Sequence, residues 1–92
     1  MEIKFDPAKS ERNARLRDLP FNLAAEFDWE SAIYLEDIRR DYPERRFVAL
    51  GLLRAKLHVI CFTPIPGGVR IISLRRANSR EIHRYAQETL NR

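Results

Sequence analysis

Three arginines stand close together in the segment 70–76, where they flank a short apolar run. Arginine suits a phosphate, because its planar guanidinium donates two parallel hydrogen bonds to one anion. If the segment is a strand, alternation places Arg70 and Arg76 on one face and Arg75 on the other. The pattern predicts an anion-binding site, and the alternative is a surface on which Arg76 merely pairs with an acid such as Glu81.

A helix start is predicted directly after these arginines. Asn78-Ser79-Arg80-Glu81 has the pattern of a capping box, in which two side chains satisfy amides of the first turn. The free amides and the partial positive charge of a helix N-terminus favour a bound phosphate. The capped terminus therefore strengthens the prediction of an anion site at the end of the strand.

Charge is divided unequally along the chain. Residues 1–44 hold seven Lys/Arg and eleven Asp/Glu, whereas residues 45–92 hold ten Lys/Arg and two Asp/Glu. Fourteen of the seventeen cations are arginine. This separation indicates one face built for a polyanion such as nucleic acid, and the alternative is an ordinary solvated surface.

RNA is a polyanion that can be cleaved without a metal ion, because its 2′-hydroxyl can attack the neighbouring phosphate. The protein must then supply a base, a proton donor for the leaving oxygen, and cations for the phosphorane. Arginine suits only the last role, since it stays protonated. The sequence has no metal-ligand spacing and no glycine-rich phosphate loop, so we expect neither a metal nor another cofactor.

Few side chains could move the proton. His58 and His83 have intrinsic pKa values near ~6.5, but mid-strand packing is favoured for His58 and an exposed structural place for His83. Glu81 and Tyr85 are four residues apart on the predicted helix, so both could reach the strand-end arginines. The alternatives are a capping role for Glu81 and a core place for Tyr85, and the identity of the base stays open.

Two further arginines, Arg45 and Arg46, precede an apolar strand. Arg46 could point across the sheet toward Arg70, while Glu44 is close enough in sequence to neutralise the pair. Aromatic side chains can stack on unpaired bases, and for Trp29 the alternative is a place in the core or in an interface. The aromatic candidates are Trp29, Tyr34 and Tyr42.

Hydrophobic periodicity predicts the elements that position these residues. Strands are expected near residues 3–5, 32–36, 47–53, 56–63 and 69–74, and helices near 7–16, 22–28 and from 79 onward. Arg54-Ala55 has the spacing of a tight hairpin. The fold class is α+β, in the order β-α-α-β-β-β-β-α, with an antiparallel sheet of four to five strands packed by helices.

The chain is short enough for a single domain over residues 1–92, and it contains no internal repeat. No apolar run approaches the ~18–20 residues of a membrane span, and the first residues lack the features of a signal peptide. A lone cysteine, Cys61, agrees with a reducing compartment. We therefore expect a cytoplasmic protein without a membrane partner.

Three segments together resemble one known family. The opening carries Phe5-Asp6-Pro7-Ala8-Lys9, then Asn13, Phe21 and Ala24-Ala25. The middle carries Glu44-Arg45-Arg46-Phe47-Val48-Ala49-Leu50-Gly51, an acid and arginine before an apolar strand that ends in glycine. The last segment runs from Arg70-Ile71-Ile72-Ser73-Leu74-Arg75-Arg76 to Glu81, and Tyr85 follows. This combination resembles the BrnT family of ribonuclease toxins from type II toxin–antitoxin systems.

The resemblance implies a RelE-like fold and a toxin that cleaves RNA without a metal ion and thereby inhibits translation. It also implies neutralisation by a BrnA-type antitoxin with a ribbon-helix-helix domain, through which alone the toxin would reach operator DNA. Carried over by position, the catalytic candidates are Arg46, Arg70, Arg75, Arg76, Glu81 and Tyr85. The further arginines expected to bind RNA are Arg17, Arg45, Arg80 and Arg84.

One departure from the family pattern bears on activity. Leu16-Arg17-Asp18 stands where the family commonly has Lys-His-Gly. Arg17 could replace a phosphate contact but not a histidine proton shuttle, and Asp18 tolerates a left-handed turn less well than glycine. The second hypothesis is therefore a weak or inactive homologue that acts as a nucleic-acid- or antitoxin-binding module in a repressor complex. A DNA-binding protein acting alone has no helix-turn-helix pattern to support it.

Overall fold

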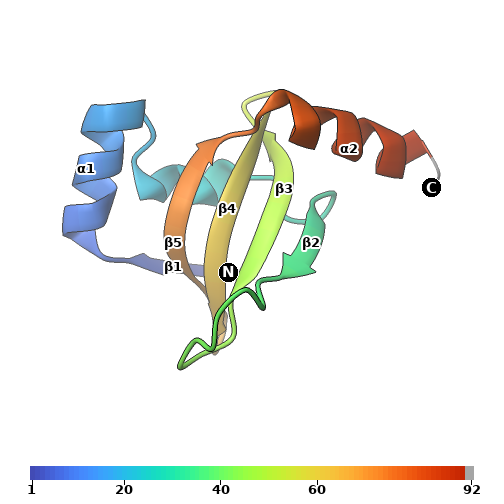
Figure 1. Cartoon of the computed structure of the whole chain (residues 1–92). Helices are drawn as coiled ribbons and strands as arrows, with labels where there is room; N and C mark the ends of the chain where they lie inside the picture. Colours follow the sequence, from blue (N-terminus) through green and yellow to red (C-terminus); the bar gives the residue numbers. More distant parts are fainter. Residues whose placement is uncertain (91–92) are drawn as a thin grey trace.

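The structure, a computed structural model, describes residues 1–90, and the elements follow one another in the predicted order (Figure 1). The strands are β1 (Glu2–Phe5), β2 (Ile33–Glu36), β3 (Phe47–Leu53), β4 (Lys56–Ile65) and β5 (Gly68–Arg76). The helices are α1 (Pro7–Arg17), the 3-10 helix η1 (Phe21–Glu26) and α2 (Ser79–Leu90). The predicted α+β class is confirmed. The second predicted helix is a short 3-10 helix, because extended residues on both sides confine it to six residues.

The five strands form one mixed sheet in the order β1-β5-β4-β3-β2. Strands β2 to β5 are antiparallel to their neighbours, but β1 is parallel to β5, with Glu2 opposite Gly68 and Phe5 opposite Ile71. The prediction of an antiparallel sheet is therefore wrong at this edge. Gly68 permits the close approach, because a Cβ there would lie 1.9 Å from the carbonyl oxygen of Glu2.

The core lies between one face of the sheet and η1. Phe21 and Ala24 of η1 are buried, and Phe27 follows them into the same cluster. Gly51 of β3 makes room for the Phe27 ring, because a Cβ at Gly51 would lie 2.7 Å from it. From the sheet, the largest fully buried side chains are Leu53, Ile60 and Leu74.

The first helix is fastened to this core mainly by polar contacts. Asp6 caps it by accepting a hydrogen bond from the Ala8 amide at 2.9 Å. Further along, the Asn13 side chain donates to the carbonyl oxygens of Leu19 at 2.7 Å and of Leu74 at 2.9 Å. Asn13 thus links α1 to β5 at the position just before the paired arginines.

Strand β5 contains an irregularity that the sequence did not predict. Cys61 of β4 lies opposite Ser73, whereas the next residue, Phe62, lies opposite Ile71. Ile72 is therefore an extra residue on β5, which is the geometry of a β-bulge. The alternation of side chains between the two faces of the sheet is therefore shifted by one residue after the bulge, relative to the alternation before it.

This shift changes the faces on which the arginines lie. Ile71 and Leu74 both point into the core, with 2% and 1% of their surface exposed, although they are three residues apart. Arg70 precedes the first of them and Arg75 follows the second, so both arginines lie on the opposite face. The prediction that Arg70 shares a face with Arg76 is therefore wrong.

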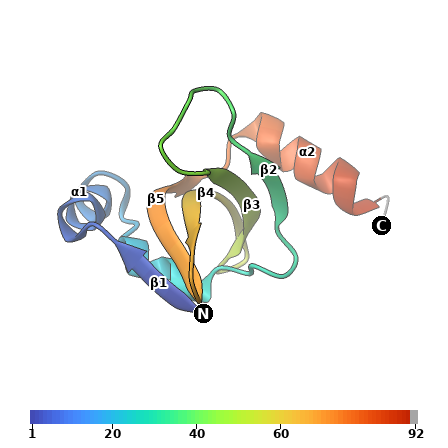
Figure 2. The ribbon, with the colours of Figure 1, turned by 90° about the horizontal axis from the view of Figure 1, so that it is seen from below.

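The face of the sheet away from η1 is only partly covered. In Figures 1 and 2, α1 and α2 lie on opposite sides of the sheet, and α2 extends outward beyond β3. No residue of α2 is buried. Neither α2 nor any other helix within residues 1–90 is long and apolar enough to cross a membrane.

Candidate active site

The open face of the sheet forms a groove of about 600 Å³, here called the front groove. It lies between the loop of residues 37–46, strands β3 to β5 and the first turns of α2. Five residues singled out in the sequence line it, namely Tyr42, Arg46, Arg75, Glu81 and Arg84. The structure thus brings one catalytic arginine candidate from each side of the groove toward the same space.

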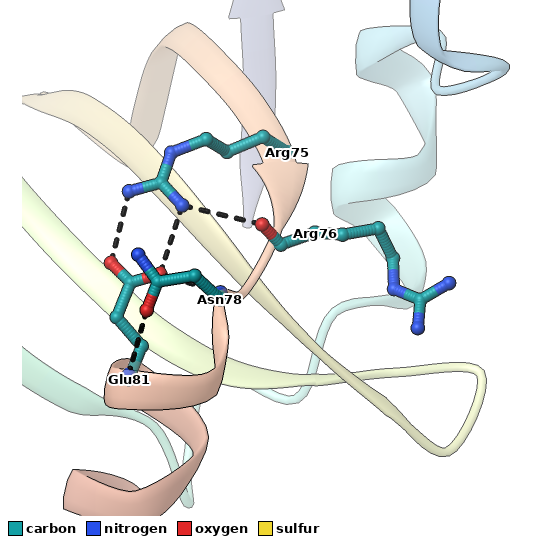
Figure 3. Close-up of polar contacts among 4 residues, drawn as sticks. All are labelled: Arg75, Arg76, Asn78 and Glu81. Atoms are coloured by element: carbon teal, nitrogen blue, oxygen red, sulfur yellow. Dashed lines mark hydrogen bonds and ion pairs between the residues drawn. The ribbon is translucent and has the colours of Figure 1, made fainter.

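Arg75 and Glu81 form the best-ordered pair in the front groove (Figure 3). Two guanidinium nitrogens of Arg75 donate to the two carboxylate oxygens of Glu81, each at 2.9 Å. The same carboxylate accepts from the Asn78 amide at 2.9 Å, and Asn78 accepts from the Glu81 amide at 2.9 Å. The predicted capping box is confirmed, and Arg75 is the ion-pair partner of its acid, Glu81. Arg75 lowers the pKa of Glu81, so this carboxylate is ionised at neutral pH.

A buried acid organises the opposite side of the groove. The Asp37 side chain is 2% exposed and accepts hydrogen bonds from two guanidinium nitrogens of Arg39, each at 2.9 Å. These bonds hold the pKa of Asp37 well below its ordinary range. The Tyr42 hydroxyl also donates to Asp37, at 3.2 Å. Asp37 therefore fixes the orientation of the Tyr42 ring.

Arg46 lies over that ring. Its guanidinium carbon is 4.2 Å from the ring centroid of Tyr42, which is a cation–π arrangement. The Nε atom of Arg46 is buried without a hydrogen-bond partner, and no ion pair within residues 1–90 involves this side chain. A buried, unmatched donor is costly, and an anion in the groove would satisfy it.

Unlike Arg46, the arginines Arg45 and Arg70 each pair with an acid. Arg45 is exposed and donates to both carboxylate oxygens of Glu36, at 3.0 and 2.9 Å. Arg70 pairs with Glu44 of the loop. The predicted convergence of Arg46 on Arg70 is therefore not seen, because the first stacks on Tyr42 and the second turns to Glu44.

Arg76 lies on the other side of the sheet edge, and Figure 3 shows its side chain pointing away from Arg75. It lines a second cleft of about 320 Å³, here called the rear cleft. The charged and titratable residues that line this cleft are Arg17, Asp18, Arg54, Lys56, His58 and Arg76. The alternative pairing of Arg76 with Glu81 is wrong, because Arg75 occupies that acid.

The remaining candidates lie outside the front groove. Tyr85, Arg80 and His83 all belong to α2, but none is among the residues that line the groove. His58 is buried as predicted, and burial, with Arg76 and Lys56 nearby, lowers its pKa. The described residues of the front groove thus include no histidine.

Sequence reasoning missed four titratable residues of the groove, Glu36, Asp37, Arg39 and Cys61. Burial raises the pKa of the Cys61 thiol, and nearby Asp37 raises it further. The spacing of Asp37 and Arg39 was the available signal, since an aspartate can hydrogen-bond the backbone two residues on, as Asp37 does at 3.2 Å. No three His, Cys, Asp or Glu side chains of the described chain lie where they could share a metal ion.

Comparison with known protein families identifies the family of the chain. The family model for the ribonuclease toxin BrnT, of type II toxin–antitoxin systems, matches residues 5–81. The chain belongs to the BrnT family. The match includes the loop of residues 37–46, Arg75, Arg76 and the capping Glu81, and it ends before Arg84 and Tyr85. A search of curated proteins found no matching relative.

Membership of the BrnT family gives the groove a chemical context. A ribonuclease toxin must bind RNA, and its partner in a type II system is an antitoxin. The front groove offers what a phosphate needs, namely Arg46 without an acid partner and Arg75 held in a fixed orientation. Fixed donors of this kind stabilise developing negative charge more effectively than donors that must reorganise.

Proposed function

We propose that this BrnT-family chain is a RelE-like, metal-independent endoribonuclease that cleaves RNA in the front groove by attack of the 2′-hydroxyl on the adjacent phosphate. The observation that carries the proposal is the pair of arginines on opposite sides of the groove. One of them, Arg46, has no acid partner, and the other, Arg75, is oriented by Glu81. Two cations facing one phosphate are suited to the dianionic phosphorane.

Glu81 is the carboxylate best suited to accept the 2′-hydroxyl proton. It is ionised at neutral pH because Arg75 lowers its pKa, and a quarter of its side chain is exposed to the groove. Asp37 is a poorer base, because its side chain is only 2% exposed, against 25% for Glu81. The low pKa of Glu81 makes it a weak base, so most of the rate enhancement comes from the arginines.

The proposal extends to the setting of the toxin. Cleavage of cytoplasmic RNA inhibits translation, and a BrnA-type ribbon-helix-helix antitoxin neutralises the toxin. Operator DNA is then contacted through the antitoxin. An antitoxin that inserts an acidic side chain between Arg46 and Arg75 would occupy the place of the RNA phosphate, since the same donors serve both anions.

The test is cleavage of a single-stranded RNA by the purified chain in the presence of EDTA. We expect products with a 2′,3′-cyclic phosphate and a 5′-hydroxyl, and no cleavage where a 2′-deoxy nucleotide precedes the scissile phosphate. Arg75→Ala should abolish cleavage and Arg15→Ala, an exposed change on α1, should not. Cleavage that requires added metal, or that survives Arg75→Ala, would reject the proposed mechanism.

Growth after induced expression separates the toxin from an inactive homologue. A toxin arrests growth, and the Arg75→Ala variant at a matched soluble level does not. If neither protein arrests growth or cleaves RNA, the chain is the inactive homologue, which binds nucleic acid or antitoxin without cutting.

A further inference from the structure

The rear cleft carries more unpaired positive charge than the front groove. Arg17, Lys56 and Arg76 line it from α1, β4 and β5, and none of the ion pairs among residues 1–90 involves them. Arg54 also lines the cleft but is held by Glu26, through two hydrogen bonds at 2.9 and 3.0 Å. By contrast, Arg75 in the front groove is already matched by an acid. The rear cleft is thus the stronger electrostatic attractor for an anion.

A buried histidine faces this cleft. His58 is 4% exposed and lies directly opposite Arg76 in the β4–β5 pairing. Its Nδ1 lies 2.8 Å from the carbonyl oxygen of Lys56, so Nδ1 carries the proton and donates. Within the described chain Nε2 has no hydrogen-bond partner. In the neutral ring Nε2 is an acceptor, and it becomes a donor to an oxygen-bearing anion when the ring is protonated beside the three cations.

The rear cleft and the front groove each include one of the last two residues of β5. Arg75 and Arg76 are consecutive, yet their side chains point to opposite sides of the strand (Figure 3). The Arg75 guanidinium also donates to the Arg76 carbonyl oxygen at 3.2 Å, so it touches the strand end from the groove side. A flexible polyanion bound at Arg75 can therefore continue around the strand end and reach Arg76.

We propose that the rear cleft binds a backbone phosphate of the same single-stranded RNA whose scissile phosphate lies in the front groove. This inference rests on the proposed ribonuclease function for the identity of its ligand. In this arrangement Arg17, Lys56 and Arg76 surround the phosphate, and His58 completes the contact from the floor of the cleft. The cleft fixes the path of the RNA on either side of the cleaved bond and makes no base contact, so it adds affinity without sequence preference.

Protonation of His58 is coupled to this binding. In the free protein, burial and then Arg76 and Lys56 lower the pKa of His58. A phosphate in the cleft offsets the positive charge around the ring and accepts a hydrogen bond from a protonated Nε2, so binding raises that pKa. RNA affinity should therefore increase as pH falls. The charged groups around the ring are Lys56 of β4, Arg76 of β5, Arg54 of the β3–β4 turn, and Arg17 and Asp18 at the end of α1.

The test measures binding of a labelled 2′-O-methyl single-stranded RNA, which has no free 2′-hydroxyl and is not cleaved. Fluorescence anisotropy over a range of salt concentrations gives the slope of log affinity against log salt. Removal of one phosphate contact should make this slope shallower by about 0.7 for a single strand. We expect this change for Arg76→Ala and for Lys56→Ala, both exposed side chains whose removal leaves the core intact. Arg15→Ala, the same charge change on the exposed face of α1, should leave the slope unchanged.

Nuclear magnetic resonance gives an independent readout at His58. Addition of the 2′-O-methyl RNA should raise the pKa of His58 in the native protein but not in Arg76→Ala/Lys56→Ala. Slopes of Arg76→Ala and Lys56→Ala that equal that of Arg15→Ala, with no change at His58, would overturn the inference. The inference would also be overturned if a polyglutamate peptide, and not RNA, bound in a way that depends on Arg76 and Lys56. That result would assign the cleft to an acidic protein segment.

The two proposals fail in different ways. If the native chain cleaves RNA but Arg76→Ala and Lys56→Ala bind it unchanged, the rear cleft proposal is wrong and the ribonuclease stands. If no RNA is cleaved but the slope still depends on Arg76 and Lys56, the ribonuclease proposal is wrong and the rear cleft stands as a phosphate site.

Discussion

Glu81 accepts two hydrogen bonds from Arg75, each at 2.9 Å, while its carboxylate also caps the first turn of α2. One side chain thus fixes the direction of an arginine that we propose to be catalytic and the place where the last helix begins. A cap that is also an ion-pair partner couples the helix to the groove. Substitutions at Glu81 that keep or remove the cap can therefore distinguish its effect on RNA cleavage from its effect on the stability of the fold.

Glu81→Gln tests this coupling. Glutamine can still cap the helix, as glutamine does in capping boxes, so we expect little change in the free energy of unfolding. It cannot accept a proton and binds Arg75 more weakly, so RNA cleavage should fall by about 10²-fold or more. Initial cleavage rates and urea unfolding curves for Glu81→Gln and Glu81→Ala check both statements. Wild-type cleavage by Glu81→Gln would show that the carboxylate has no role in proton transfer.

Arg46→Ala tests the unpaired cation of the groove, with Arg45→Ala as its neighbour and matched control. Removal of a fixed donor to the transition state should lower the cleavage rate by about 10²–10³-fold. Stability should change by less than about 1 kcal/mol, because a weak cation–π contact with Tyr42 is lost together with an unsatisfied donor. Arg45 pairs with exposed Glu36 and does not line the front groove, so its removal should leave the rate at saturating RNA unchanged. Equal rates for the two variants would argue against a role of Arg46.

Asp37 makes stability depend on pH. Its pKa is lowered in the folded state, first by Arg39, so the ionised form stabilises the protein above the ordinary aspartate pKa of 3.8. That stabilisation is lost as pH falls below 3.8 toward the lower folded value. Asp37→Asn should therefore be less stable than the native chain at about pH 7, and the difference should shrink at about pH 3. Urea unfolding at both pH values measures it, and a difference that grows on acidification would contradict the assignment.

Gly51→Ala tests the packing beneath the sheet. A Cβ at this position would lie 2.7 Å from the ring of Phe27 and 2.9 Å from the Cβ of Ala32. Both neighbours are buried, so the added methyl group should destabilise the fold by about 1–3 kcal/mol. Thermal unfolding gives the value, with Gly67→Ala as a contrast in which no atom lies within 4 Å and only the positive φ of 77° is strained. A Gly51→Ala protein as stable as the native chain would show that the core can yield there.

Local features of the structure were predictable because neighbouring residues determine them. Asp6 caps α1, Asn78 and Glu81 form the capping box, and Arg54-Ala55 turns the hairpin with positive φ angles of 51° and 65°. The departure at Asp18 is also seen, since it adopts the left-handed conformation at φ 59°. In each case the hydrogen bonds or the turn involve residues a few positions apart, so sequence spacing is sufficient.

The arrangement of the site was only partly predictable from the sequence. The sequence by itself determined the arginine-rich segment, the α+β class and the order of the elements. Only the tertiary structure decided that β1 pairs in parallel with β5, that Ile72 bulges, and that Arg70 therefore lies on the face of Arg75 and not on that of Arg76. A bulge and a strand partner depend on the register between segments far apart in the chain. That register follows from which side chains fill the core together, and no local pattern contains it.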